Sequence, residues 1–242
     1  MRVMATLLLG ALVQDGKRNQ FPTAYSGGKF GLADADSAQQ IAWLVSGGTL
    51  FCCHNLLTGI SWKALAQHSM VFGCRAEIDG FEFLCRIPLP GEAPSGEWDE
   101  AVDLVQGDDR IFHWKDFRSW CQSVGLSAGT RVVRGGGMAK EWQSYPENAY
   151  ACWRPVLEPK GVPIPQTGLR LQAGYELLVW DDNCVVRGKF LDESDYDLVL
   201  QSSGTWFADA GVLFQPLEKK IRTIAVDKSQ VRMVQIGRYI GS

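Results

Sequence analysis

Cysteine and histidine are the side chains of this sequence that could act as nucleophiles or bind a metal ion. The 242 residues include 3 histidines and 7 cysteines, the latter at positions 52, 53, 74, 85, 121, 152 and 184. The spacings CxxC, HxxxH and HxH do not occur, so the sequence lacks the pattern of a structural zinc site. A thiol–histidine pair could combine Cys121 or Cys152 with His113, but no motif positions it. We therefore expect buried, unpaired thiols in a reducing compartment, with no metal and no cofactor.

Acidic residues gather between positions 97 and 109 and could offer oxygen ligands to calcium. Their spacing differs from that of an EF-hand, so we favour a solvated acidic loop over a calcium site. The glycine run of RVVRGGG, residues 131–137, lacks the Lys-Ser/Thr of a P-loop and the GxGxxG of a dinucleotide turn. Lys and Arg number 24 against 27 Asp and Glu, and no long run of either sign occurs. We therefore expect neither nucleic acid nor a membrane surface as a partner.

Residues 131–158, RVVRGGGMAKEWQSYPENAYACWRPVLE, combine arginines, consecutive glycines and aromatics in one short span. RVV is typical of a short strand, the glycines permit positive φ or a close backbone approach, and CWRPVLE is typical of a closing strand. We expect Arg134 and Arg154 to anchor the chain, because a guanidinium can donate a planar fork to loop carbonyls or buried carboxylates. The segment between these arginines is a candidate contact surface.

The N-terminal half contains both strand and helix signals. The apolar run 3–13 predicts a buried strand that ends at the Gln14-Asp15-Gly16 turn, with a signal-peptide core as the alternative. Residues 16–33 predict an extended arm, since turn formers dominate and no period is sustained. Asp34–Ser37 could cap a short helix that ends at Gly47-Gly48.

Downstream signals predict further short elements. TLFCCHNLL favours a strand, Ser61 is a possible cap for the helical spacing of SWKALAQHSM, and Asp79-Gly80 is a tight-turn dipeptide between two hairpin strands. Residues 91–127 predict a loop-rich segment pinned by its tryptophans, with a helix over 114–124.

Three prolines, Pro159, Pro163 and Pro165, predict a semi-stiff linker over residues 159–167. Beyond it, residues 168–242 alternate short β-rich runs with turns, and about five strands would make a small barrel without exposed edges. The predicted organisation is a strand and arm over 1–34, a domain over 35–158, the linker, and the barrel.

Five motifs together resemble a pattern of uncharacterised bacterial and phage proteins: EIDGFEFLCRIPLPG, EWDEAVD, IFHWKDFRSWCQ, RVVRGG and ACWRPVLE. The last of these are similar to the formylglycine-generating-enzyme branch of the C-type-lectin-like fold, in which R-V-x-R-G-G-S-W is followed by G-F-R-P-V. The resemblance covers roughly residues 50–158. It implies a loop-rich scaffold whose arginines and tryptophans hold irregular chain in place.

The departures from this branch bear on activity. Family enzymes that oxidise a substrate cysteine resemble one another in a closely spaced cysteine pair, whereas here only Cys152 lies between Gly135 and Pro159. Other members of the fold are binding platforms with a variable patch near the end of the domain. That resemblance implies the following ligand-binding residues: Lys140, Trp142, Gln143, Tyr145, Asn148 and Tyr150. Such aromatic and polar side chains suit a contact surface, and burial of Trp142 and Tyr150 in the core is the alternative.

We therefore predict an α+β protein, with a C-type-lectin-like domain followed by a small SH3-like β-barrel. The predicted function is non-enzymatic: recognition of a protein or glycan, or a structural role, in a phage virion, its tail or host-attachment apparatus, or a bacterial surface assembly. We expect a homo-oligomer or part of a larger assembly. The alternatives are a metal or thiol enzyme of the formylglycine-generating type and a barrel that binds nucleic acid.

Overall fold

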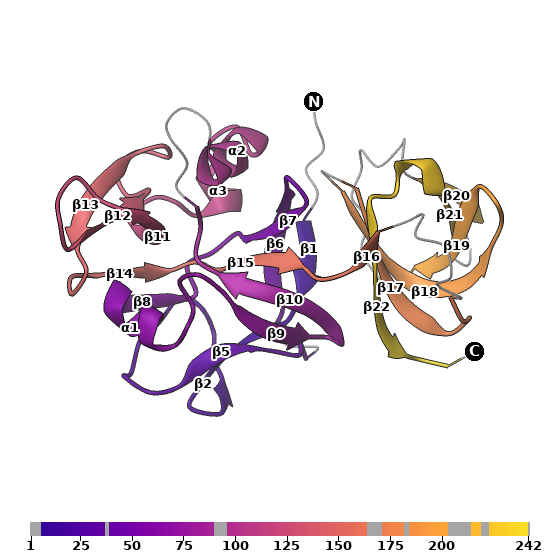
Figure 1. Cartoon of the computed structure of the whole chain (residues 1–242), viewed down its shortest axis with the longest axis horizontal. Coiled ribbons are helices and arrows are strands. Elements are labelled where there is room, and N and C mark those ends of the chain that lie inside the picture. Colours follow the sequence, from indigo (N-terminus) through magenta and orange to yellow (C-terminus); the bar gives the residue numbers. More distant parts are fainter. Residues whose placement is uncertain are drawn as a thin grey trace.

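The chain folds into a nearly all-β protein, so the predicted α+β class is wrong, and the predicted C-type-lectin-like domain is not confirmed. The computed structural model describes residues 6–36, 39–89, 96–163, 171–181, 184–202, 214–218 and 223–241. Among the described residues, strands account for 52% and helices for 11%. Figure 1 shows the strands gathered into several curved sheets, with three short helices beside them.

The first sheet has six strands in the order β1-β6-β7-β15-β10-β9. Its strands are β1 (Thr6–Leu9), β6 (Ile41–Ser46), β7 (Thr49–Cys52), β15 (Val156–Pro159), β10 (Phe81–Arg86) and β9 (Cys74–Ile78). The helix predicted after Asp34–Ser37 is wrong, since Ile41–Ser46 is a strand. Trp43 and Leu44 enter different hydrophobic clusters on the two faces of this sheet. A strand buried on both faces loses its apolar–polar alternation, so the pattern was ambiguous.

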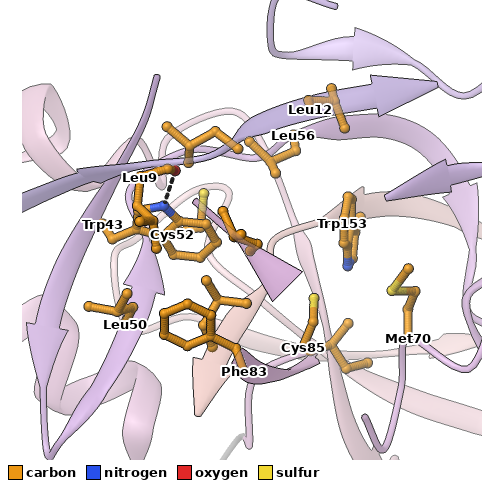
Figure 2. Close-up of a cluster of buried hydrophobic side chains, with 14 of the residues drawn as sticks. Leu9, Leu12, Trp43, Leu50, Cys52, Leu56, Met70, Phe83, Cys85 and Trp153 are labelled. Atoms are coloured by element: carbon orange, nitrogen blue, oxygen red, sulfur yellow. Dashed lines mark hydrogen bonds between the residues drawn. The ribbon is translucent and has the colours of Figure 1, made fainter. Parts of the chain in front are cut away.

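The main core lies on one face of this sheet (Figure 2). Trp43 is fully buried there, and its indole Nε1–H donates to the carbonyl of Leu9 at 2.8 Å. Trp153 and Phe83 fill the same cluster from two other strands. The indole hydrogen bond matters because a buried polar tip without a partner would weaken the core.

The second sheet has six strands in the order β13-β12-β11-β14-β8-β4. Its strands are β13 (Trp142–Pro146), β12 (Thr130–Arg134), β11 (Ser119–Val124), β14 (Tyr150–Trp153), β8 (Leu57–Ser61) and β4 (Thr23–Ala24). The helix predicted over 114–124 is wrong, because β11 is a central strand. Its Trp120 is fully buried and donates to the carbonyl of Ile60 at 2.8 Å. Strands β2 (Ala11–Gln14), β3 (Lys17–Arg18) and β5 (Phe30–Ala33) form a small third sheet.

Several local predictions are confirmed. Helix α1 (Trp62–Gln67) begins at Ser61, whose hydroxyl accepts from the backbone N–H of Ala64 at 3.2 Å. The dipeptide Asp79-Gly80 joins β9 to β10, and both residues have positive φ. The loop predicted around residues 97–109 is wrong in part, because it contains α2 (Glu97–Leu104) and α3 (Asp109–Phe112). Acidic residues in the first turn of α2 favour this helix through its dipole.

The C-terminal strands form a curved, seven-stranded half-barrel sheet in the order β16-β22-β17-β18-β19-β21-β20. Its strands are β16 (Val162–Pro163), β17 (Tyr175–Trp180), β18 (Val185–Glu193), β19 (Asp197–Ser202), β20 (Phe214–Glu218), β21 (Thr223–Asp227) and β22 (Met233–Tyr239), with a 3-10 turn over Lys228–Gln230. Within the described residues no pairing joins β20 to β16, so the predicted closed SH3-like barrel is corrected to a half-barrel. Residues 164–167 of the predicted linker lie outside the described residues.

Packing on the rest of the protein replaces barrel closure. Leu178 and Trp180 of β17 enter the main core, whereas Leu177 and Val179 enter a separate cluster inside the half-barrel. The sheet therefore covers one apolar face by docking. Figure 1 shows it beside the β9–β10 hairpin.

Candidate functional site

The predicted contact segment forms the open edge of the second sheet. Strand β13 is the outermost strand and pairs on one side only, with β12. The ladder continues into a hydrogen bond from the N–H of Glu147 to the carbonyl of Gly129 at 3.0 Å. Along an antiparallel strand, every second residue forms its backbone hydrogen bonds with the neighbouring strand. Glu147 bonds on the β12 side, so Tyr145, two residues earlier, also bonds toward β12. The backbone N–H and C=O groups of Trp142 and Ser144 then point to the open edge.

The turn that precedes β13 depends on glycine. Gly135 has a φ of 81°, and a Cβ there would lie 3.0 Å from the carbonyl oxygen of Trp114 and 3.1 Å from that of Phe117. Only glycine combines this φ with such a close approach. The chain leaving β12 is thereby held against the 114–117 segment.

Glu141 closes the same turn from inside. Its carboxylate accepts from the N–H groups of Gly137 at 2.8 Å and Met138 at 3.2 Å, and from the amide of Gln143. The hydrogen bond from Gln143, followed by that from Gly137, lowers the pKa of Glu141. The Glu141 carboxylate therefore keeps these hydrogen bonds, and the turn stays closed, at every pH at which Glu141 is ionised.

Two buried side chains fix the turn to helix α2. The indole of Trp98 donates to the carbonyl of Ala139 at 2.7 Å. Arg134 forms an ion pair with Asp99 of the same helix and donates to the carbonyl of Lys140 at 3.3 Å. Both side chains of the ion pair are 3% exposed. The structure therefore confirms the predicted anchoring role of Arg134.

Arg154 is the second predicted anchor, and it too is confirmed. Its fully buried guanidinium donates to the carbonyls of Cys52, Cys53 and His113 and to the hydroxyl of Ser119, at 2.7–3.2 Å. It sits where the chain passes from β14 to β15, between the first and second sheets.

The structure divides the six predicted ligand-binding residues between exposed and half-buried positions. Lys140, Trp142, Asn148 and Tyr150 are exposed, with exposed fractions of 42% for Trp142 and 74% for Tyr150. Gln143 and Tyr145 are half-buried on the opposite face of β13, where the Tyr145 ring packs against Trp120 at 6.2 Å between centroids. Trp142 and Tyr150 lie on strands β13 and β14, which are separated by two others. The six residues therefore do not form one contiguous surface.

Two exposed apolar residues extend the surface beside Trp142. Met138 lies in the Glu141 turn and is 66% exposed, and Leu126 is 81% exposed. The backbone N–H of Leu126 donates to the Ser144 hydroxyl at 2.7 Å, which brings this residue to β13. Leu126 was not predicted, because the β11–β12 turn that carries it reaches β13 only through tertiary pairing. We call Met138, Trp142, Ser144 and Leu126, with the outer edge of β13, the β13 edge surface.

A charged cleft of about 390 Å³ lies between the half-barrel and the rest of the protein. Arg187 bonds to Glu176 at 2.8 Å and to Asp79 at 3.4 Å, and Arg238 forms an ion pair with Asp34. Each of these three carboxylates therefore already has an arginine partner. This pairing makes the cleft a joint between the two parts rather than an open ligand site.

The thiols near the buried anchor are poor nucleophiles. Burial raises the pKa of Cys52 and Cys53 to about 12 and that of Cys152 to about 11, and raises that of Cys121 further. In the described part of the chain, neither the Cys121 nor the Cys152 sulfur is hydrogen-bonded to His113. No group of three or more His, Cys, Asp and Glu side chains is placed to hold a metal among the residues described.

His54 and His113 stack on one another, with ring centroids 3.9 Å apart. Burial lowers the pKa of His54 to about 4, assisted by repulsion from His113 and Arg154. Burial followed by repulsion from Arg154 also lowers the pKa of His113, against the attraction of Asp109. Both rings are therefore neutral in the folded protein at neutral pH.

This pair predicts a loss of stability on mild acidification. The unfolded chain binds protons at its histidines near pH 6.5, whereas folded His54 binds one only near pH 4. The contribution of the neutral histidines to the free energy of unfolding is therefore complete above about pH 6.5 and is lost as the pH falls toward about 4. We expect the urea midpoint to fall between about pH 7 and about pH 5, and to fall less in His54→Phe, which keeps a ring in the stack. An equal fall of the urea midpoint with pH in wild type and His54→Phe would contradict this prediction.

Comparison with known proteins finds no matching family model, no similar curated protein and no similar solved structure. Among the described residues, no helix has both the length and the apolar character needed to cross a membrane.

Proposed function

We propose that this chain is a non-enzymatic recognition protein that binds an extended segment of a partner protein along the β13 edge surface. The observation that carries this proposal is the open edge of β13. Exposed apolar side chains flank this edge, and Glu141, Trp98 and Arg134 hold the turn that precedes it. An extended peptide can pair with such an edge through its main chain and place alternate side chains on the flanking residues.

The outward positions of β13 lack the features that normally protect sheet edges. Edge strands usually carry charges that discourage pairing. Edge strand β9 follows this rule, because Arg75 and Glu77 are exposed on it. In β13 the edge-directed residues Trp142 and Ser144 are uncharged, and only Pro146 limits pairing at one end.

The apolar neighbours supply binding energy and selectivity. Trp142, Met138 and Leu126 offer exposed apolar area beside the edge, and tryptophan is among the residues that contribute most at interfaces. The anchored turn is already ordered before binding, so little conformational entropy is lost there on association. An alternating apolar strand of a protein suits this arrangement better than a glycan.

The wider context stays a prediction. A partner within a phage virion or a bacterial surface assembly would fit the proposal, with the half-barrel available for attachment. The alternative of a formylglycine-generating-type metal or thiol enzyme is tested by metal analysis and thiol titration of the purified protein.

Selection from a library of displayed peptides tests the proposal. We expect wild type to enrich peptides with alternating apolar residues, and Ser144→Pro to weaken their binding at least about tenfold, because it removes an edge N–H without breaking the ladder to β12. Ser144→Ala is the matched control. It also loses the bond from Leu126 but keeps the N–H, so it should bind the peptides much more tightly than Ser144→Pro does.

Two outcomes would overturn the proposal. One is equal binding of the selected peptides to Ser144→Pro and Ser144→Ala. The other is failure to enrich any peptide, together with specific binding of the protein to a glycan array. A concentration-dependent dimer abolished by Ser144→Pro would instead identify the edge of a second copy as the bound segment.

A further inference from the structure

We propose that Cys74 and Cys85 form a site of reversible oxidation, at which a cross-strand disulfide closes the β9–β10 hairpin. The two residues are directly opposite each other in the antiparallel register of these strands. Both belong to the main core: Cys85 is buried within it, and Cys74 packs against it half-buried. This site is independent of the β13 edge surface.

The hairpin geometry fits a disulfide. The two-residue turn Asp79-Gly80 lies between Ile78 and Phe81, which are paired across the hairpin. Counting back in steps of two places Cys74 and Cys85 at a hydrogen-bonded pair, whose Cα atoms are typically about 5.5 Å apart. Disulfides span Cα separations of about 4.4–6.8 Å, and this spacing lies within that range. Directly opposite side chains also point to the same face of the sheet.

The surroundings place both sulfurs together. Figure 2 shows Cys85 inside the core with Met70 nearby. The Cys74 sulfur is 3.6 Å from the sulfur of Met70. A hydrogen bond from the Cys85 thiol to Cys74 lowers the pKa of Cys74 to about 7 and raises that of Cys85.

The two thiols have different accessibility, which sets their order of reaction. Cys74 is half-buried, whereas Cys85 is 1% exposed. The Cys74 thiolate is therefore the attacking group and Cys85 the resolving group. The thiols of Cys52 and Cys53, with pKa values raised to about 12 by burial, lack this activation.

The oxidant we invoke is a low-molecular-weight disulfide such as glutathione disulfide. The Cys74 thiolate attacks one of its sulfurs, forms a mixed disulfide and releases one thiolate. Cys85 then loses its proton, attacks the Cys74 sulfur and releases the second thiolate. The protein loses two protons and two electrons overall, and the small disulfide takes them up to become two thiols.

The disulfide would stabilise the β9–β10 hairpin, which is the platform that the half-barrel contacts. The Gln235 amide of β22 donates to the carbonyl of Glu82 in β10 at 2.5 Å, and Arg187 of β18 bonds to Asp79 in the turn. Closing residues 74–85 into a covalent loop removes conformations of the unfolded chain and holds this platform. We expect the oxidised protein to melt about 5–10 °C above the reduced protein.

Peptide mapping tests the site directly. Trypsin cleaves after Lys63, Arg75 and Arg86, so the two cysteines fall in separate peptides, 64–75 and 76–86. After equilibration of the folded protein with glutathione disulfide and alkylation of free thiols, we expect these two peptides to be joined and to separate on reduction. The melting shift should accompany the joined peptides.

Cys74→Ala and Cys184→Ala are the matched variants. Cys184 is a buried thiol of the half-barrel cluster, so its loss controls for removing a buried cysteine. We expect Cys184→Ala to keep the joined peptides and the melting shift, and Cys74→Ala to lose both. Recovery of both peptides alkylated, or joining of either one to another cysteine, would overturn the proposal even if the variants fold poorly, because the mapping uses the wild-type protein.

Discussion

Replacing Arg154 with methionine is expected to destabilise the protein by about 3–5 kcal/mol. The guanidinium satisfies two buried carbonyls, one part-buried carbonyl and one buried hydroxyl. Methionine fills part of the volume but donates nothing. Each carbonyl left without a partner then costs about 1–3 kcal/mol.

The hydrogen-bond acceptors of the Arg154 guanidinium described above are carbonyls and a hydroxyl, with no carboxylate among them. Burial lowers its pKa to about 10, so the side chain is still protonated at neutral pH. The ring of Phe112 lies 4.3 Å from the guanidinium carbon and that of Trp98 lies 5.3 Å away, so ring faces and carbonyl dipoles together stabilise the cation. The acceptors come from the end of β7, the segment after α3, and β11, so one side chain joins three parts of the fold.

Urea unfolding of Arg154→Met and Arg154→Lys measures this effect. Lysine keeps the charge but replaces the planar fork with a single ammonium, so we expect it to recover only part of the loss. If Arg154→Met does not fold, Arg154→Lys still reports the effect through a reduced midpoint. A methionine variant within about 1 kcal/mol of wild type would show that the carbonyls find other partners.

The ion pair between Arg134 and Asp99 is expected to give the second large effect. Removing one partner leaves a buried charge without compensation, which costs about 3–5 kcal/mol. We expect Asp99→Leu and Arg134→Met each to show such a loss. Because Arg134 also donates to the turn before β13, Asp99→Leu should weaken peptide binding at the β13 edge surface even where the protein remains folded.

A double-mutant cycle separates the pair from its surroundings. Arg134→Met combined with Asp99→Leu removes both charges, so the double variant should be more stable than the sum of the single losses predicts, by about 1–3 kcal/mol. Losses that simply add would mean that the two side chains act independently. Circular dichroism of each variant checks that the sheets are retained.

Local features of the fold could be predicted from sequence because they depend on neighbouring residues. Ser61 caps α1 through its own hydroxyl, and Asp79-Gly80 supplies the two positive φ values of a tight hairpin. Arg134 and Arg154 were predicted as anchors because a guanidinium can donate a planar fork to loop carbonyls or buried carboxylates. None of these requires knowledge of a distant part of the chain.

The fold class could not be predicted from sequence, because distant pairing decides it. Residues 41–46 become a strand between β1 and β7, and apolar clusters on both faces of the sheet remove the alternation that would identify them. Residues 119–124 become a central strand because β12 and β14 flank them. The same apolar runs would suit a buried helix in another context.

The candidate site shows the same division between sequence and tertiary structure. The sequence by itself determined that residues 138–150 combine aromatic and short polar side chains next to a glycine turn and two anchoring arginines. Tertiary structure decided that Trp142 is exposed and Tyr145 is half-buried, because strand pairing sends alternate residues to opposite faces. It also brought Leu126 to Ser144. Side-chain chemistry is a property of each residue, whereas exposure and proximity depend on sheet order and register, which only the folded chain defines.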